Sequence, residues 1–162
     1  MFDISSVRND LKKNMYEDLN DFIKGLFHDE RDAIANMSNL ASLIYHILPE
    51  INWAGFYLYK DTELVLGPFH GKPACIRITL GKGVCGTAAS LEETQLVEDV
   101  HTFEGHIACD GETKSEIVIP IVKDGKLIGV LDLDSPVIKR FDNEDKDALE
   151  AIVEILTKAC DF

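Results

Sequence analysis

SEIVIPIVKDGKLIGVLDLD, residues 115–134, carries the clearest structural signal in this chain. Two runs of apolar and β-branched residues, 115–122 and 126–134, flank the dipeptide Asp124-Gly125. An Asp-Gly pair between such runs is a strong hairpin signal, because both residues accept the left-handed backbone of a tight turn. The sequence therefore predicts two adjacent antiparallel strands here.

The length of the hairpin loop decides which face Glu116 occupies, because a shift of one residue turns a whole strand over. A two-residue turn would pair Glu116 with Leu133. A three-residue loop of residues 123–125, with a bulge at its glycine, would place Glu116 opposite Asp132. Asp132 and Asp134 share a face because they alternate with leucines. We predict the three-residue loop, which brings the three acids together.

Helices are expected on either side of this strand-rich region. Apolar residues spaced by three and four predict helices at about 7–27 and 32–48, and a capping box formed by Asp142 and Asp145 predicts a final one. Short β-rich segments separated by turn residues predict further strands at 51–60, 62–69, 74–80 and 94–100, with a short helix after the glycines of 81–90. The fold class expected is α+β, an antiparallel sheet of about six strands with helices mainly on one side, in one domain covering residues 1–162.

Composition excludes several classes of function. A chain of 162 residues with a formal net charge of -13 lacks the basic face that nucleic-acid binding requires. No apolar run approaches the roughly 20 residues needed to span a bilayer, and no basic run offers a membrane patch. The start of the chain lacks the features of a signal peptide. We therefore expect a cytoplasmic protein with reduced thiols.

Three of the four cysteines stand where active residues gather. Cys75, Cys85 and Cys109 lie beside glycine or proline, in loops or at the ends of elements. Cys160 instead continues the apolar stripe of the last helix, and we interpret it as a small buried hydrophobe.

Zinc binding is a competing use for these thiols, with His70 or His106 as a further ligand. Structural zinc sites usually take cysteines in close pairs, about two to four residues apart. Here the gaps between the three cysteines are nine and twenty-three residues. No metal or other cofactor is therefore expected.

Five blocks of the chain carry a resemblance to a known family: GPFHGKPAC (67–75), GKGVCGTA (81–88), GHIACD (105–110), SEIVIP (115–120) and LDLDSP (131–136). In these blocks the chain resembles the free methionine-(R)-sulfoxide reductases, which are stand-alone GAF-domain enzymes. His70 and Glu104 depart from the family's pattern. The resemblance implies a GAF-type fold and a thiol-dependent oxidoreductase that acts on the free amino acid, with a role in oxidative stress.

The resemblance also implies roles for the cysteines. Cys109 would attack the sulfoxide sulfur as a thiolate and become a sulfenic acid. Cys75 would condense with it to a disulfide, which a thioredoxin-type dithiol would reduce. Cys85 would be either a second resolving thiol or a structural neighbour.

The substrate site implied by the resemblance contains Glu116, Asp132 and Asp134. These acids would bind the ammonium group of the substrate, or one of them, with a raised pKa, would protonate the sulfoxide oxygen. Trp53 and Tyr57 share a face of the first strand, which usually means a core pair, but the resemblance places Trp53 at the methyl-sulfinyl group. The partners expected are free methionine sulfoxide and a thioredoxin-type reductant, with a homodimer left open.

A binding module is the alternative to an enzyme. GAF folds also bind cyclic nucleotides, bilins and other small effectors, and a fold does not decide a function. The chain shows no output module, which favours the enzyme. Consumption of free methionine sulfoxide would separate the two hypotheses.

Overall fold

The structure, a computed structural model, describes residues 3–8, 10–105 and 110–162. In these ranges, six strands form one antiparallel sheet in the order β3-β2-β1-β6-β5-β4. The strands are β1 (Trp53–Lys60), β2 (Glu63–Gly71), β3 (Arg77–Thr79), β4 (Gln95–Val97), β5 (Ser115–Lys123) and β6 (Lys126–Ser135). The predicted α+β class and the sheet of about six strands are confirmed.

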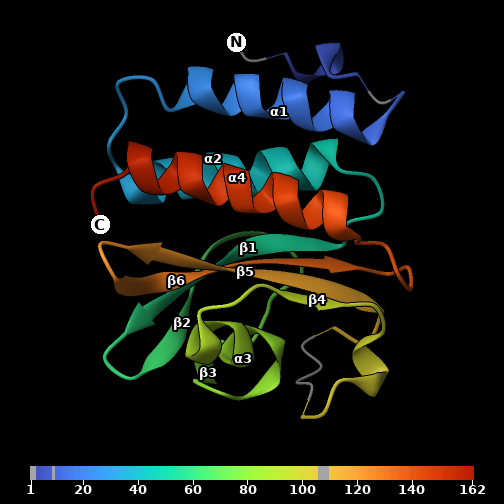
Figure 1. Cartoon of the computed structure of the whole chain (residues 1–162), viewed down its shortest axis with the longest axis vertical. Helices are drawn as coiled ribbons and strands as arrows, with labels where there is room; N and C mark the ends of the chain where they lie inside the picture. Colours follow the sequence, from blue (N-terminus) through green and yellow to red (C-terminus); the bar gives the residue numbers. More distant parts are fainter. Residues whose placement is uncertain (1–2, 9, 106–109) are drawn as a thin grey trace.

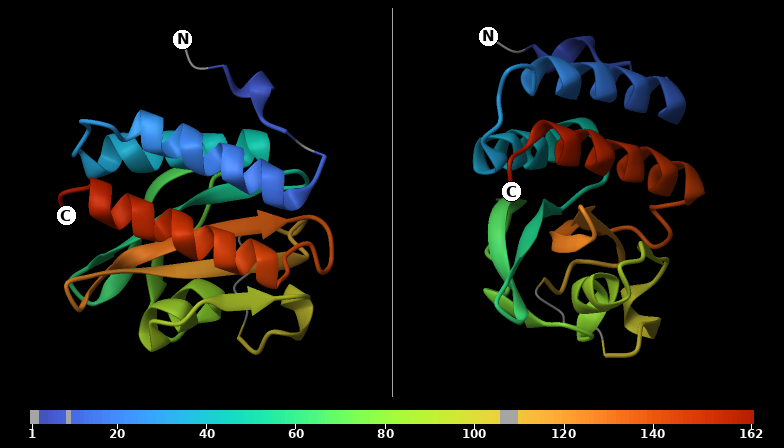
Figure 2. Two further views of the ribbon diagram at one scale, coloured as in Figure 1. Left: turned by 45° about the horizontal axis from the view of Figure 1, so that its top comes forward. Right: turned by 60° about the vertical axis from the view of Figure 1, so that its left-hand side comes forward.

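Helices cover the two faces of the sheet unequally (Figure 1). Three helices lie on one face: α2 (Ala33–Ile47) contacts β1 and β2, α4 (Asn143–Ala159) contacts β5, and α1 (Lys12–Leu26) packs on both helices as an outer layer. The short helix α3 (Gly83–Leu91) lies on the other face, against β5 and β6. Figure 2 shows the same order of layers from two other directions. None of these helices is long and apolar enough to cross a membrane.

Two apolar clusters fill the spaces on either side of the sheet. Leu131 and Leu133 of β6 belong to the larger cluster, under α1, α2 and α4. Val130 belongs to the smaller cluster, between the sheet and α3. Because side chains alternate along a strand, Asp132 points to the same side as Val130. The sheet therefore presents its acidic residues to the side where α3 lies.

The first helix is shorter than the sequence predicts. It begins at Lys12, and Leu11 before it has an extended backbone with φ -134. A short 3-10 turn, Ile4–Ser6, precedes it. The backbone N–H and the guanidinium of Arg8 both donate to the carboxylate of Asp18, at 2.8 and 2.9 Å. This contact holds the segment before the helix back against α1 and prevents it from continuing the helix.

The predicted capping box of α4 is present. Asp142 accepts hydrogen bonds from the backbone of the first turn, and Asp145 accepts one from the backbone of Asp142. The buried carboxylate of Asp145 also accepts from the hydroxyl of Tyr16 at 2.7 Å and from Lys12 at 2.8 Å. The side chain of Arg140 lies 3.3 Å away. One buried charge therefore ties α1 to the start of α4.

The hairpin loop differs from the prediction. Lys123 pairs with Lys126, so the turn has two residues, Asp124 and Gly125, with φ values of 53 and 72. Two successive left-handed residues form a type I′ turn, whose twist matches that of the strands. The prediction of a three-residue loop is wrong, because Asp-Gly satisfies the tighter turn without strain.

A bulge further along the hairpin places Glu116 on the same face of the sheet as the two aspartates. Val122 pairs with Leu127 but Ile121 pairs with Gly129, which leaves one extra residue on β6. The shift brings Glu116 opposite Asp134, where an unbroken two-residue hairpin would have placed Leu133. The partner predicted for Glu116 was therefore wrong, but the prediction that it shares a face with the two aspartates is confirmed.

Candidate active site

A pocket lies between the sheet and the first turn of α3. Its lining residues come from β1, β5 and β6, from α3, and from the segments around residues 72–78 and 110–113. Six of the eight site residues predicted from the sequence line it: Trp53, Tyr57, Cys85, Glu116, Asp132 and Asp134. Residues far apart in the sequence therefore meet at one place because neighbouring strands present the same face.

Two aromatic rings form one wall of the pocket. The rings of Trp53 and Tyr57 stack with centroids 5.9 Å apart, and the ring of Phe69 also stacks with that of Trp53, at 5.4 Å. The hydroxyl of Tyr57 donates to the backbone carbonyl of Cys75 at 3.0 Å, and the indole N–H donates to the carbonyl of Lys72 at 3.1 Å. The wall is thus fixed and is joined directly to the segment that carries Cys75.

Three carboxyl groups gather on the floor of the pocket. Glu116 and Asp132 are each only 6% exposed, and Asp134 is half-buried. Burial raises the pKa of Asp132 to about 7. Burial, and then the charge of Asp132, raise the pKa values of Glu116 and Asp134 well above the usual range. The charge of Asp132 therefore disfavours ionisation of both Glu116 and Asp134.

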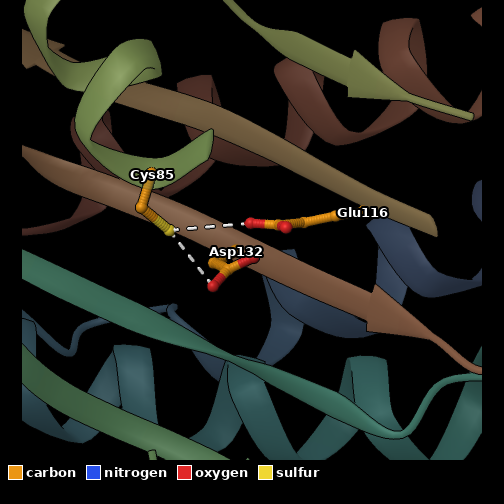
Figure 3. Close-up of side chains that lie close together, drawn as sticks. All are labelled: Cys85, Glu116 and Asp132. Carbon is orange, nitrogen blue, oxygen red and sulfur yellow. Dashed lines mark hydrogen bonds between the residues drawn. The ribbon is translucent and has the colours of Figure 1, made fainter. Parts of the chain in front are cut away.

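Cys85 reaches into this cluster from α3 (Figure 3). Its thiol donates to Oδ2 of Asp132 at 3.2 Å and lies 4.0 Å from Oε1 of Glu116. Burial, and then the charges of Asp132 and Glu116, raise the pKa of the thiol well above its usual value. A helix N-terminus normally lowers the pKa of a thiol, but here the buried acids outweigh it. The arrangement keeps Cys85 protonated.

A glycine allows α3 to approach the sheet closely enough for this contact. A Cβ atom on Gly86 would lie 2.4 Å from the backbone oxygen of Thr79, a separation that real structures do not show. The carbonyl of Gly86 also accepts a hydrogen bond from the backbone N–H of Gly81 at 2.7 Å. The glycine-rich stretch 81–88 therefore fixes the position of Cys85.

The other cysteines differ in state and place. Cys75 is half-buried at the edge of the pocket, next to the lining residue Ala74, and takes part in a disulfide. Cys160 is a free, buried thiol in the core on the helical side, where the side-chain amide of Asn36 donates to it at 3.4 Å. This agrees with its interpretation as a core residue. Cys109, the predicted nucleophile, lies outside the described residues.

Sequence reasoning missed four polar residues of the pocket, namely Lys72, Lys82, Asp110 and Thr113. The ammonium of Lys72 lies 3.4 Å from Oδ2 of Asp110 and also pairs with Glu112. The side-chain amide of Asn52 donates to the hydroxyl of Thr113 at 3.3 Å. Lys72 and Asp110 belong to the two family blocks that contain Cys75 and Cys109, so their nearness to those cysteines was the available signal.

His70, which departs from the pattern of the family, does not line the pocket. Its ring lies against Tyr45 and His46 of α2, at centroid distances of 4.2 and 4.8 Å. It therefore belongs to the helical side of the sheet. Among the described residues, the group that could hold a metal ion is instead Cys85, Glu116 and Asp132, whose ligand atoms all lie within 4.8 Å of one another.

Comparison with known proteins agrees with this geometry. A family model described as GAF domain matches residues 35–161. The chain is 50% identical over 147 residues to the free methionine-R-sulfoxide reductase of Escherichia coli, covering 91% of this chain and 89% of that protein. A structure of fRMsr of Staphylococcus aureus in complex with substrate matches with a TM-score of 0.86 and 55% identity, over 89% of this chain and 94% of that one.

A third match is to the free methionine-R-sulfoxide reductase of Neisseria meningitidis in complex with its substrate, with a TM-score of 0.91 and 40% identity. It covers 94% of this chain and 92% of the other. Fold and sequence agree with these proteins along nearly the whole chain, so this protein has a GAF domain and belongs to the free methionine-R-sulfoxide reductase family.

Proposed function

We propose that this protein reduces free methionine-(R)-sulfoxide to methionine with its own thiols. The observation that carries the proposal is one pocket in which an aromatic wall and three carboxyl groups, two of them buried, meet beside the disulfide-bonded Cys75. The identity of about half to reductases with this activity over nearly the whole chain supports the same reaction and substrate. The match to residues 35–161, together with the packing of α1 on α2 and α4, supports one GAF-like domain for the entire chain.

The carboxyl groups suit a zwitterionic substrate. An ammonium group favours an ionised carboxylate, and Asp132 is the acid of the three that ionises most readily. The raised pKa values of Glu116 and Asp134 favour their protonated forms, which can donate a proton toward the sulfoxide oxygen. The ring of Trp53 offers the apolar surface that the methyl group needs. In this proposal Asp132 binds the ammonium group of the substrate, and Glu116 or Asp134 protonates the sulfoxide oxygen.

The thiol chemistry follows the proposed order. The thiolate of Cys109 attacks the sulfoxide sulfur, methionine leaves, and the oxygen remains on Cys109 as a sulfenic acid. The thiol of Cys75 then displaces that oxygen as water and forms a disulfide. A thioredoxin-type dithiol returns both cysteines to thiols by exchange. Such a cycle needs a reducing compartment, which supports a cytoplasmic location.

The direct test is consumption of substrate. The purified protein with dithiothreitol should convert free methionine-(R)-sulfoxide to methionine over many turnovers and should leave the (S) isomer unchanged, as measured by chromatography. A small-molecule-binding module would bind a ligand without converting it. Absence of methionine formation by folded, fully reduced protein would overturn the proposal.

A further inference from the structure

We propose that Cys85, Glu116 and Asp132 form a binding site for a thiophilic divalent cation of the size of zinc. The three side chains come from α3, β5 and β6 and point toward one another (Figure 3). All three are buried, and their ligand atoms lie within 4.8 Å of one another. This set differs from the three cysteines with a histidine that the sequence suggested for zinc.

The distances within the cluster suit a tetrahedral ion. With a Zn–S bond of about 2.3 Å and a Zn–O bond of about 2.1 Å, tetrahedral geometry separates sulfur from oxygen by about 3.6 Å. The thiol sulfur of Cys85 lies 3.2 Å from Oδ2 of Asp132 and 4.0 Å from Oε1 of Glu116. The two distances fall on either side of the ideal value. The two carboxylate oxygens lie within 4.8 Å of each other, against about 3.4 Å in an ideal tetrahedral site, so Glu116 and Asp132 would have to close on a cation by up to about 1.4 Å.

Asp132 supplies an independent reason to expect a ligand. Asp132 is only 6% exposed, and its oxygen Oδ1 is buried and has no hydrogen-bond partner among the described residues. A buried polar atom without a partner is costly, and such atoms commonly mark a place where an ion or another ligand binds. A cation held by Asp132 would neutralise this carboxylate.

The donor set selects the kind of cation. A thiolate is a soft ligand that favours zinc-like ions over magnesium and calcium, which prefer oxygen alone. Three protein ligands leave a fourth tetrahedral position for water or another small ligand. The site lies in the pocket proposed to take the substrate, so cation and substrate should exclude each other. This last step rests on the proposed function.

Cobalt is a suitable probe, because Co²⁺ replaces zinc in tetrahedral sites and a bound thiolate gives a charge-transfer absorption. The titration is done with the full chain carrying Cys75→Ser and Cys109→Ser, so that only the thiols of Cys85 and Cys160 remain. We expect one cobalt per chain with a thiolate band, and displacement by one equivalent of zinc. Cys85→Ser should abolish the band, and Asp132→Asn should weaken binding at least about tenfold.

The matched control is Cys160→Ser, which removes a buried thiol on the other side of the sheet and should leave the band unchanged. If Cys85→Ser fails to fold, mass spectrometry of the parent protein should show that zinc protects Cys85 from alkylation. No thiolate band in the folded parent, or a band that survives Cys85→Ser, would overturn the site. If free methionine sulfoxide does not change the band, the cation site stands, but the proposal that cation and substrate exclude each other is overturned. This result does not depend on whether the wild-type protein reduces the substrate.

Discussion

The thiol of Cys85 lies 3.2 Å from Oδ2 of Asp132, in a contact buried between α3 and β6. A thiolate at this place would stand beside a carboxylate with little water to separate the two charges. Burial and the charge of Asp132 accordingly raise the pKa of the thiol. Since the thiolate is the nucleophile in disulfide chemistry, Cys85 is poorly suited to resolve a sulfenic acid. Its contact favours the structural-neighbour role over that of a second resolving thiol.

Cys85→Ser should therefore keep multiple turnovers, within about tenfold of the wild-type rate, because a hydroxyl can occupy the same hydrogen-bonded position. Cys75→Ser should release about one methionine per chain and then stall, since its thiol is the one proposed to form the disulfide. The measurement is the amount of methionine released over time, with a thioredoxin-type protein as the only reductant. Stalling of Cys85→Ser after one turnover would show that it resolves instead.

Cys109→Ser should abolish turnover altogether, because without that thiolate no bond to the sulfoxide sulfur forms. Even a single turnover should be missing, which distinguishes this variant from Cys75→Ser. Cys160→Ser is the control, since its thiol lies in the core on the helical side and should not affect the reaction. Full turnover by the Cys109 variant would remove it from the role of nucleophile.

Blocking the amino group of the substrate should also prevent reaction. N-acetylmethionine sulfoxide cannot offer an ammonium to the buried carboxyls, and it leaves Asp132 without a counter-charge. We expect kcat/KM for the acetylated compound to fall at least about a hundredfold, the size of a lost buried charge interaction of roughly 3 kcal/mol. Comparable rates for the two compounds would mean that the acids have another task.

Local patterns allowed much of this arrangement to be predicted. The alternation of Asp132 and Asp134 with leucines was enough to place both acids on one face, because a strand has a period of two. The capping box at Asp142 was equally local and is present. Such features depend on a few neighbouring residues, so the sequence states them directly.

Long-range contacts were harder to predict. The pairing of Glu116 with Asp134 depends on a bulge between Leu127 and Gly129 of β6. The glycine inside this strand was the available signal for the bulge, and the prediction did not use it. The contact of Cys85 with Asp132 depends on how α3 packs across the sheet, which periodicity does not give. Lys72 was missed as a pocket residue because a surface lysine is usually a solvated charge.

The pKa of Asp132 gives a prediction about stability and pH. The folded-state pKa of about 7 lies above the unfolded value near 3.9, so the folded state keeps a proton that the unfolded state has lost. The contribution of this group to stability is therefore complete below about pH 4 and is lost as the pH rises toward 7. For a single group, the slope is at most about 1.4 kcal/mol per pH unit.

Asp132→Asn should make the fall in stability with pH shallower, because an amide does not titrate, while Glu116 and Asp134, whose pKa values are also raised, still contribute. The measurement is the free energy of unfolding in urea between pH 4 and 7, with a chelator present to exclude metal ions. Asp147→Asn, at an exposed position on α4, is the matched control and should follow the wild-type curve. A wild-type curve parallel to that of Asp132→Asn across the whole range would contradict the raised pKa.

Gly86→Ala tests whether the close approach of α3 positions the pocket. Alanine normally favours a helix over glycine by up to about 1 kcal/mol, so propensity alone would make this variant more stable. The new Cβ would instead meet the backbone oxygen of Thr79 at 2.4 Å, and backbone atoms cannot move aside cheaply. We expect a net loss of about 1–3 kcal/mol in the free energy of unfolding and a lower kcat/KM, because α3 must shift and carry Cys85 with it.

Gly25→Ala in α1 is the control, since a Cβ there meets nothing within 4 Å and should leave stability unchanged or slightly higher. If Gly86→Ala gained stability as Gly25→Ala does, the packing of α3 would not be the constraint that holds Cys85 against Asp132.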